Sequence, residues 1–203
     1  FCWGDNSHGA TSPPKGPFVE LDQGGLFGCG RRPSGALACW GYNKNGQAKP
    51  PSGVFTQVAA GGLHACAVTK DGLAQCWGSN TSGQAKAPPG TFLEVATGFV
   101  HSCGIQLNGS VTCWGDSTWK QLNAPVGTFK RLCLGYAHSC GVRTDGTLTC
   151  WGDNSVKQGT PPKGSFTHCS ASVLHTCAVS DLGVTTCWGD GSVGQTSPPA
   201  SMK

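Results

Sequence analysis

The sequence predicts an all-β fold, a β-propeller whose blades are 37 residues long. The tripeptide Cys-Trp-Gly occurs six times at this constant spacing, and a second cysteine stands ten positions before five of the six. Short, partly alternating segments flank glycine turns, without the periodicity of a helix. A linear β-solenoid is the alternative, but serial units of about 40 residues favour a propeller. The units begin at Cys2, Cys39, Cys76, Cys113, Cys150 and Cys187.

Each complete unit contains a predicted β-hairpin. In the third unit, residues 64–69 and 73–77 are strand-like segments separated by Lys70-Asp71-Gly72. A three-residue loop with glycine in third place favours a type I turn that ends in a left-handed residue. The glycines at this place are Gly35, Gly72, Gly109, Gly146 and Gly183.

The hairpin register predicts one disulfide in each of these five units. If Thr69 faces Leu73, then Cys66 faces Cys76. This is a non-hydrogen-bonded pair, in which Cα atoms lie about 4.5 Å apart, within disulfide range. Each bond closes a small loop and contributes roughly 2 to 3 kcal/mol. The predicted pairs are Cys29–Cys39, Cys66–Cys76, Cys103–Cys113, Cys140–Cys150 and Cys177–Cys187.

A further strand is expected after the polar turn that follows Cys-Trp-Gly. Prolines and a glycine lead to a phenylalanine that again recurs every 37 residues, and an apolar segment such as FTQVAAG or FLEVATG begins there. Each unit therefore has three or four short strands. The phenylalanines are Phe18, Phe55, Phe92, Phe129 and Phe166.

The segment GGLHACAVTKDGLAQCWGSNTSGQ resembles the repeat of the regulator of chromosome condensation (RCC1) propellers. The paired cysteines together with Cys-Trp-Gly are similar to a secreted variant found in ectodomains of plant crinkly-type receptor kinases and in bacterial surface proteins. The resemblance spans the whole chain. It implies a propeller scaffold and, by likeness to those ectodomains and to a propeller-type β-lactamase inhibitor, a binding role. Nucleotide exchange, implied by the nuclear members, conflicts with an oxidised chain outside the cell.

The 203 residues are expected to form a single propeller-repeat domain, because no linker or charge run interrupts the array. The repeats do not add up to a whole number of blades. Residues 2–18 and 187–203 are copies of the same half-unit, and Cys2 lacks an upstream partner. A six-bladed ring would need about 19 further residues, and a seven-bladed ring about 56. We expect a portion of a longer chain, or a ring closed with a partner.

Composition and charge narrow the functional classes. The net charge of +4 comes from scattered residues, so the chain lacks the basic stripe that nucleic acid demands. No apolar run is long enough for membrane insertion. Thirteen cysteines in a regular pattern indicate an oxidising compartment, so we expect an extracellular protein.

Four histidines also follow the repeat, each two residues before a cysteine: His64, His101, His138 and His175. Such a pattern could bind zinc, but the disulfides account for the sulfurs and no fourth ligand is evident. We predict instead that the histidines are buried between blades and bonded to backbone carbonyls. No carboxylate pair, Ser-His-Asp order or phosphate loop is present, so the chain is expected to be no enzyme and to need no cofactor or metal.

Cys133 and Cys169 fall outside the pattern, at positions equivalent to Ala96 and Leu132. They either form a disulfide between blades or are buried as small apolar residues. Together with Cys2 they leave at least one cysteine without a partner in the sequence.

Two N-glycosylation sequons lie in predicted exposed turns, at Asn80-Thr81-Ser82 and Asn108-Gly109-Ser110. In a eukaryotic secreted protein we expect at least one to be used. Asn80 is the better candidate because Asn108 belongs to a tight turn.

Positions that vary within the constant repeat are candidates for recognition. In the loop after Cys-Trp-Gly, Trp119 is the one tryptophan outside the repeated tripeptide, and Tyr42 adds an aromatic group in an equivalent loop. A second variable position follows the glycine of the inner strand, and bulky residues occupy it in three consecutive units: Phe99, Tyr136 and Val173. Aromatic rims suit protein hot spots and sugar stacking. The repeated tryptophans are predicted to be core: Trp3, Trp40, Trp77, Trp114, Trp151 and Trp188.

These observations favour a non-catalytic extracellular module that binds a protein or peptide partner on one propeller face. A carbohydrate-binding lectin is the alternative, although its blade-related pockets should repeat, and Trp119 and Tyr42 do not. A third hypothesis is a structural component of an extracellular wall or filament, formed by self-association through the incomplete ends.

Overall fold

The structure is a computed structural model, which describes residue 2 and residues 4–199. These residues form fifteen strands in five three-stranded antiparallel sheets and no helix. Each sheet is one propeller blade, numbered here from 1 to 5 along the chain. The strands are β1 (Glu20–Gln23), β2 (Phe27–Arg31) and β3 (Leu37–Gly41) in blade 1; β4 (Phe55–Ala60), β5 (His64–Thr69) and β6 (Ala74–Gly78) in blade 2; β7 (Phe92–Thr97), β8 (His101–Gln106) and β9 (Val111–Gly115) in blade 3; β10 (Phe129–Leu134), β11 (His138–Arg143) and β12 (Leu148–Gly152) in blade 4; β13 (Phe166–Ala171), β14 (His175–Ser180) and β15 (Thr185–Gly189) in blade 5.

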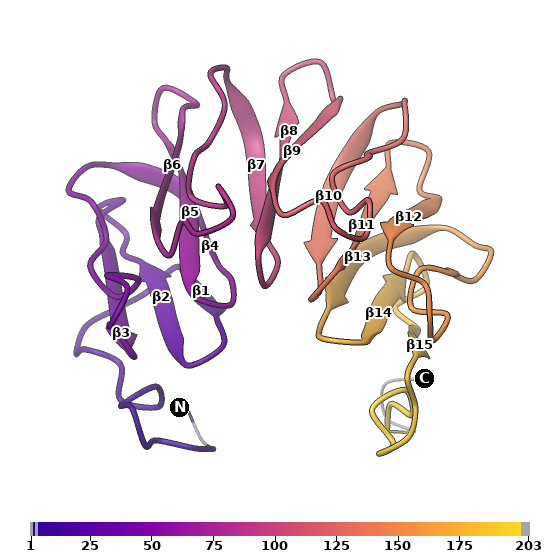
Figure 1. Cartoon of the computed structure of the whole chain (residues 1–203), viewed down its shortest axis with the longest axis horizontal. Coiled ribbons are helices and arrows are strands. Elements are labelled where there is room, and N and C mark those ends of the chain that lie inside the picture. The colour runs from indigo at the N-terminus through magenta and orange to yellow at the C-terminus, as the bar shows by residue number, and fades with distance from the viewer. Residues whose placement is uncertain (1, 3, 200–203) are drawn as a thin grey trace.

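The five blades are arranged in an arc, with the first and last segments of the described chain on its open side (Figure 1). The first strand of each blade contacts the first strand of the next, so β1, β4, β7, β10 and β13 lie along the inside of the arc. The second and third strands follow outward in each sheet. The predicted propeller fold is confirmed by this arrangement.

The hairpin register agrees with the prediction in detail. Thr69 donates its backbone N–H to the carbonyl of Leu73, and Cys66 lies opposite Cys76. Gly72 has a φ of 81°, the left-handed conformation that the turn requires. A short loop with a fixed conformation therefore sets the pairing of the whole hairpin.

The structure contains each of the five cross-strand disulfides that the register predicts, with Cα–Cα distances of 4.0 to 4.1 Å. A sixth disulfide joins Cys133 of β10 to Cys169 of β13, with Cα atoms 5.8 Å apart. Of the two roles considered for this pair, the structure shows the bond between blades. Cys2 is exposed and free.

Blades in the described chain have three strands, because the segment after Cys-Trp-Gly forms turns instead of a fourth strand. After β3, for example, Gly46 donates its N–H to the carbonyl of Asn43, and Lys49 donates to the carbonyl of Gly46. Pro50 and Pro51 follow, and neither has an N–H group for a strand ladder. The next strand begins only at Phe55.

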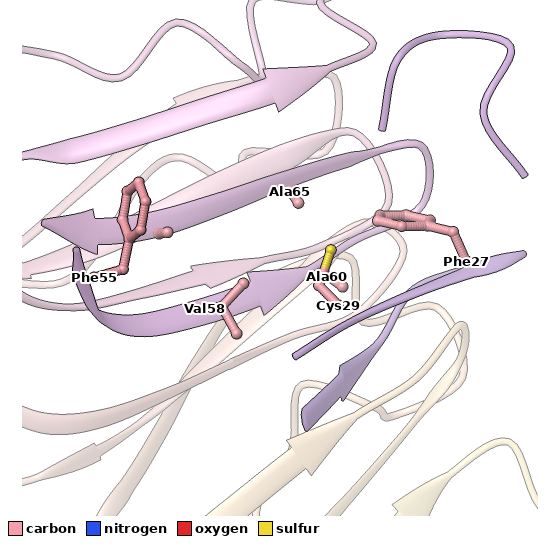
Figure 2. Close-up of a cluster of buried hydrophobic side chains, with 7 residues drawn as sticks. Phe27, Cys29, Phe55, Val58, Ala60 and Ala65 are labelled. Atoms are coloured by element: carbon pink, nitrogen blue, oxygen red, sulfur yellow. The ribbon is translucent and has the colours of Figure 1, made fainter. Parts of the chain in front are cut away.

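The hydrophobic core lies between neighbouring blades. Figure 2 shows the cluster between blades 1 and 2, which extends from Phe27 and Cys29 of β2 to Val58 and Phe55 of β4. The recurring phenylalanine is 2% to 4% exposed in blades 2 to 5. Because each cluster draws on two successive blades, no blade buries its apolar face alone.

The repeated tryptophans link each blade to the loop before it. The indole Nε1 of Trp77 donates to the Gln47 carbonyl at 2.9 Å, and Trp114 donates in the same way to Gln84. Trp114 is 7% exposed, whereas the ring of Trp77 is partly buried. The described tryptophans of the repeat are therefore structural. Trp3 lies outside the described residues.

No helix that could cross a bilayer occurs in the part of the chain that the structure describes.

Candidate binding face

The inner strands and the loops that follow them line a groove with a volume of about 410 Å³. Residues of all five blades contribute, so the groove runs along the inside of the arc. The variable position after each inner strand lies at this groove, and three of the predicted binding residues occupy it: Phe99, Tyr136 and Val173. Gly25 and Gly62 hold the equivalent positions in blades 1 and 2.

Phe99 and Tyr136 form an exposed aromatic pair at the groove. Their ring centroids are 4.7 Å apart with an interplanar angle of 34°. The two residues are 39% and 42% exposed, and Val173 on the next blade is 55% exposed. These apolar side chains are accessible to solvent. The equivalent positions of blades 1 and 2 are glycine, so the blade fold does not require a large side chain there.

Backbone hydrogen bonds between blades fix the loops that carry these residues. Phe99 donates its N–H to the carbonyl of Gly135 at 3.1 Å, and Gly62 donates in the same way to Gly98. A Cβ atom on Gly98 would clash with the Gly135 carbonyl and the His101 ring. Glycine therefore allows the close approach of neighbouring loops.

Trp119 and Tyr42 lie on the same face as the aromatic pair, but outside the groove lining. Tyr42 donates its N–H to the carbonyl of Leu26, the residue after Gly25. Trp119 is 53% exposed in the loop that starts at Asp116. The N–H of Asp116 donates to the carbonyl of Val100, the residue after Phe99, so this loop lies beside the aromatic pair. The two variable sites predicted from the repeats thus form an inner and an outer part of one face.

Tyr42 is half-buried and packs edge-on against His8, with ring centroids 5.1 Å apart. Part of its ring is therefore used in packing, whereas Trp119 has no such aromatic partner among the described residues. Of the two, Trp119 offers the larger free surface.

Two carboxylates in the groove were missed by the sequence analysis. Asp22 of β1 accepts the N–H of Ala60 in blade 2 at 2.8 Å, and burial raises its pKa to about 6. Glu94 of β7 accepts the N–H of Leu132 in blade 4 and a hydrogen bond from Arg131. Burial raises the pKa of Glu94, and these hydrogen bonds oppose the rise. The sequence contained a signal for Asp22: the residues 37 and 74 positions later are both alanine, so Asp22 departs from the repeat.

Three of the four repeated histidines, His64, His101 and His138, are buried between blades, as predicted, but their partners are different; His175 in blade 5 is half-buried. His64 Nε2 hydrogen-bonds to the Ser102 hydroxyl of the next blade, and His101 to that of Ser139, both at 2.8 Å. The prediction of backbone carbonyl partners is wrong. The side chain 38 residues later enters the junction and presents a hydroxyl to the ring. His138 binds Thr176 in the same way.

The rings of the three buried histidines are enclosed by protein. The Nδ1 atoms of His64, His101 and His138 are buried without a hydrogen-bond partner. Burial lowers the pKa of His64 and His138 to about 4 and that of His101 to about 3, so all three are neutral at pH 7. In the described residues, no group of three or more His, Cys, Asp or Glu side chains is placed to hold a metal ion.

The two sequons lie at opposite ends of the blades. Asn80 is exposed in the loop after β6, on the face that carries the groove loops. Asn108 is exposed in the turn between β8 and β9, and its Oδ1 accepts hydrogen bonds from the Ser110 N–H and hydroxyl. A glycan on Asn108 would leave the groove face free. Use of either sequon stays a prediction.

Comparison with known proteins agrees with this architecture. The sequence model of the regulator of chromosome condensation (RCC1) repeat matches residues 55–84 and 129–158. No curated protein sequence matches the chain. The structure is similar to the CRINKLY WD40 ectodomain of the Arabidopsis thaliana receptor kinase ACR4, with a TM-score of 0.76 and 27% identity, covering 95% of this chain and 74% of that one.

The complete ectodomain of the Physcomitrella patens receptor kinase CR4 is also similar, with a TM-score of 0.76 and 31% identity. The alignment covers 87% of this chain but 53% of that ectodomain, so the chain spans about half its length. Yeast RCC1 (Prp20), solved in complex with Kap60, shares the fold at a TM-score of 0.80 and 16% identity, over 93% of this chain and 65% of that one. The chain therefore has an RCC1-like β-propeller fold, with two segments that match the RCC1 repeat and with paired cysteines in its repeats.

Proposed function

We propose that the chain is a non-catalytic extracellular module that binds a protein or peptide partner on the groove face. The observation that carries this proposal is the exposed pair Phe99 and Tyr136, which stands at the groove where blades 1 and 2 have glycine. Exposed aromatic side chains beside a concave surface are typical of interface hot spots. Residues 1–203 act in this proposal as a single propeller-repeat domain.

The solved relatives support a binding role. Two of them are ectodomains of plant receptor kinases. Yeast RCC1 was crystallised with the protein Kap60, and Prp20p has described binding properties toward Gsp1p and histones. Six disulfides support a location outside the cell, since disulfides persist in oxidising compartments.

Carbohydrate binding is the second candidate, because the ring faces of Phe99 and Tyr136 could stack on a sugar. A lectin propeller should, however, repeat its pocket in several blades. The aromatic pair has no counterpart at Gly25 or Gly62, so the repeats support one extended site better than several equivalent pockets.

The proposal can be tested with a photo-crosslinking amino acid, p-benzoylphenylalanine, placed at position 99 or 136. Leu182 is the matched control, because it is 87% exposed in the turn between β14 and β15, away from the groove lining. With the extracellular fraction of the source organism, we expect a discrete protein adduct from positions 99 and 136 and none from 182.

Equal adducts at all three positions would contradict the proposal. Glycan-array binding that disappears in the Phe99→Ala variant, without any protein adduct, would instead establish the lectin. Concentration-dependent polymers in light scattering would favour the structural component.

A further inference from the structure

The groove contains one carboxylate that no cationic side chain neutralises. Asp22 and Glu94 are the charged residues of the groove lining, and no lysine, arginine or histidine belongs to it within the described chain. Glu94 is paired with Arg131, with Nη1 and Oε2 2.9 Å apart. Asp22 instead accepts hydrogen bonds from the backbone N–H groups of Gln23 and Ala60. It therefore keeps an unpaired negative charge in a concave site.

The Asp22 side chain is exposed to solvent at the groove. Each of its oxygens accepts one backbone hydrogen bond, and a carboxylate oxygen can accept two. Both oxygens thus have a lone pair left for an incoming donor. A cationic donor that reaches these lone pairs would neutralise the charge of Asp22.

The blade fold does not require a carboxylate at this position. The equivalent residues of the other blades are Ala59, Ala96, Cys133 and Ser170, all small and uncharged. The groove is therefore asymmetric. Blade 1 contributes the unpaired carboxylate. The variable loop position is Gly25 in blade 1 and Gly62 in blade 2, whereas blades 3 to 5 have apolar side chains there.

We propose that the occupant of this groove is an extended peptide segment with an arginine that pairs with Asp22, while adjacent apolar side chains pack on Phe99, Tyr136 and Val173. This inference rests on the proposed function and specifies its ligand. Arginine fits because its planar guanidinium donates two parallel hydrogen bonds to a carboxylate. The groove lining has no cation of its own that would repel it.

The overall charge of the chain makes the inference specific. The net charge is +4, so a cationic peptide is not attracted by the molecule as a whole. Retention of arginine-containing peptides must then come from a local anionic site. Asp71 provides a matched control, because it is an exposed aspartate in the turn between β5 and β6, remote from the groove lining.

The test is selection of a phage-displayed random heptapeptide library on the wild-type protein, Asp22→Asn and Asp71→Asn. Asparagine keeps an oxygen to accept the Ala60 N–H, so Asp22→Asn removes the charge with little effect on folding, which thermal unfolding verifies. We expect peptides that combine arginine with apolar residues from the wild type and from Asp71→Asn. Their affinity should fall at least about ten-fold for Asp22→Asn and for peptides with citrulline, a neutral analogue, in place of arginine.

Three outcomes separate this inference from the function on which it rests. The first is selection of apolar peptides without arginine that bind all three proteins but bind Phe99→Ala/Tyr136→Ala more weakly. This result would overturn the proposed pairing of arginine with Asp22 but support the groove as the binding face. Peptides that bind the Phe99→Ala/Tyr136→Ala variant equally well would overturn both. The absence of any enriched peptide would likewise overturn the proposed peptide ligand.

Discussion

The junction between blades 1 and 2 differs from the later junctions in a way that explains how the repeat can vary. At the later junctions, a buried histidine pairs with a hydroxyl of the next blade, as His64 does with Ser102. At the first junction the histidine is replaced by Phe27 and the hydroxyl residue by Ala65, and both are fully buried. The two positions therefore change together, from a polar pair to an apolar one. Complementarity between blades, more than the identity of either residue, holds the array together.

The largest expected effect is acid destabilisation of the histidine junctions. Because burial lowers the pKa of His64, His101 and His138 below the ordinary 6.5, the unfolded chain binds more protons than the folded chain as the pH falls below 6.5. The raised pKa values of Asp22 and Glu94 act in the opposite direction, but they oppose three histidines with larger combined shifts. We expect a net loss on the order of 5 kcal/mol between pH 7.5 and 4.5, measured by denaturant unfolding.

The first junction supplies the control for this effect. The double variant His101→Phe/Ser139→Ala copies its apolar pair into a later junction, and the variant should lose less stability on acidification than the wild type. An unfolding free energy that does not change between pH 7.5 and 4.5 would contradict the comparison.

The next largest effect concerns the covalent link between blades 4 and 5. Replacing Cys133 and Cys169 by alanine opens a loop of 36 residues and should reduce stability by about 4 kcal/mol. Replacing Cys66 and Cys76, which close a ten-residue loop, should cost about 3 kcal/mol. Thermal unfolding of both variants checks the order. A larger loss for the hairpin pair would show that the link between blades contributes little.

Removal of one partner of a polar junction should have a smaller effect. Ser139→Ala leaves the buried Nε2 of His101 without a hydrogen bond and should cost about 2 kcal/mol. Adding His101→Phe should recover part of this loss, because it recreates the pair found at the first junction. Denaturant unfolding of the two single variants and the double variant measures the coupling. Additive losses would mean that the two positions are independent.

The smallest effect on stability is expected at the groove. Phe99 and Tyr136 are exposed, so Phe99→Ala/Tyr136→Ala should reduce the unfolding free energy by about 1 kcal/mol. A much larger loss would show that the pair serves the fold instead of a partner. Thermal unfolding next to the wild type is sufficient to decide.

The sequence predicted the features that depend on one hairpin, and was less successful with features that depend on two blades. A loop ending in Gly72 fixes which residues face each other, so the Cys66–Cys76 bond follows from local geometry. The tilt between blades is not encoded locally. The partner of His64 was therefore predicted incorrectly, and the pairing of Cys133 was left open.

The candidate site shows the same limit. Comparison of the repeats identified Phe99 and Tyr136 as variable positions, but it could not show that they stack or that they line a groove with Asp22. Nor could it show that Trp119 lies on the same face. These relations arise only when the inner strands assemble.

The most direct test of the account is the affinity of the extracellular partner recovered by crosslinking at position 99, measured by titration calorimetry on the wild type and on Phe99→Ala/Tyr136→Ala. Since these side chains are exposed, affinity should fall at least about 30-fold while thermal stability stays nearly constant. An unchanged affinity would contradict recognition through the groove face.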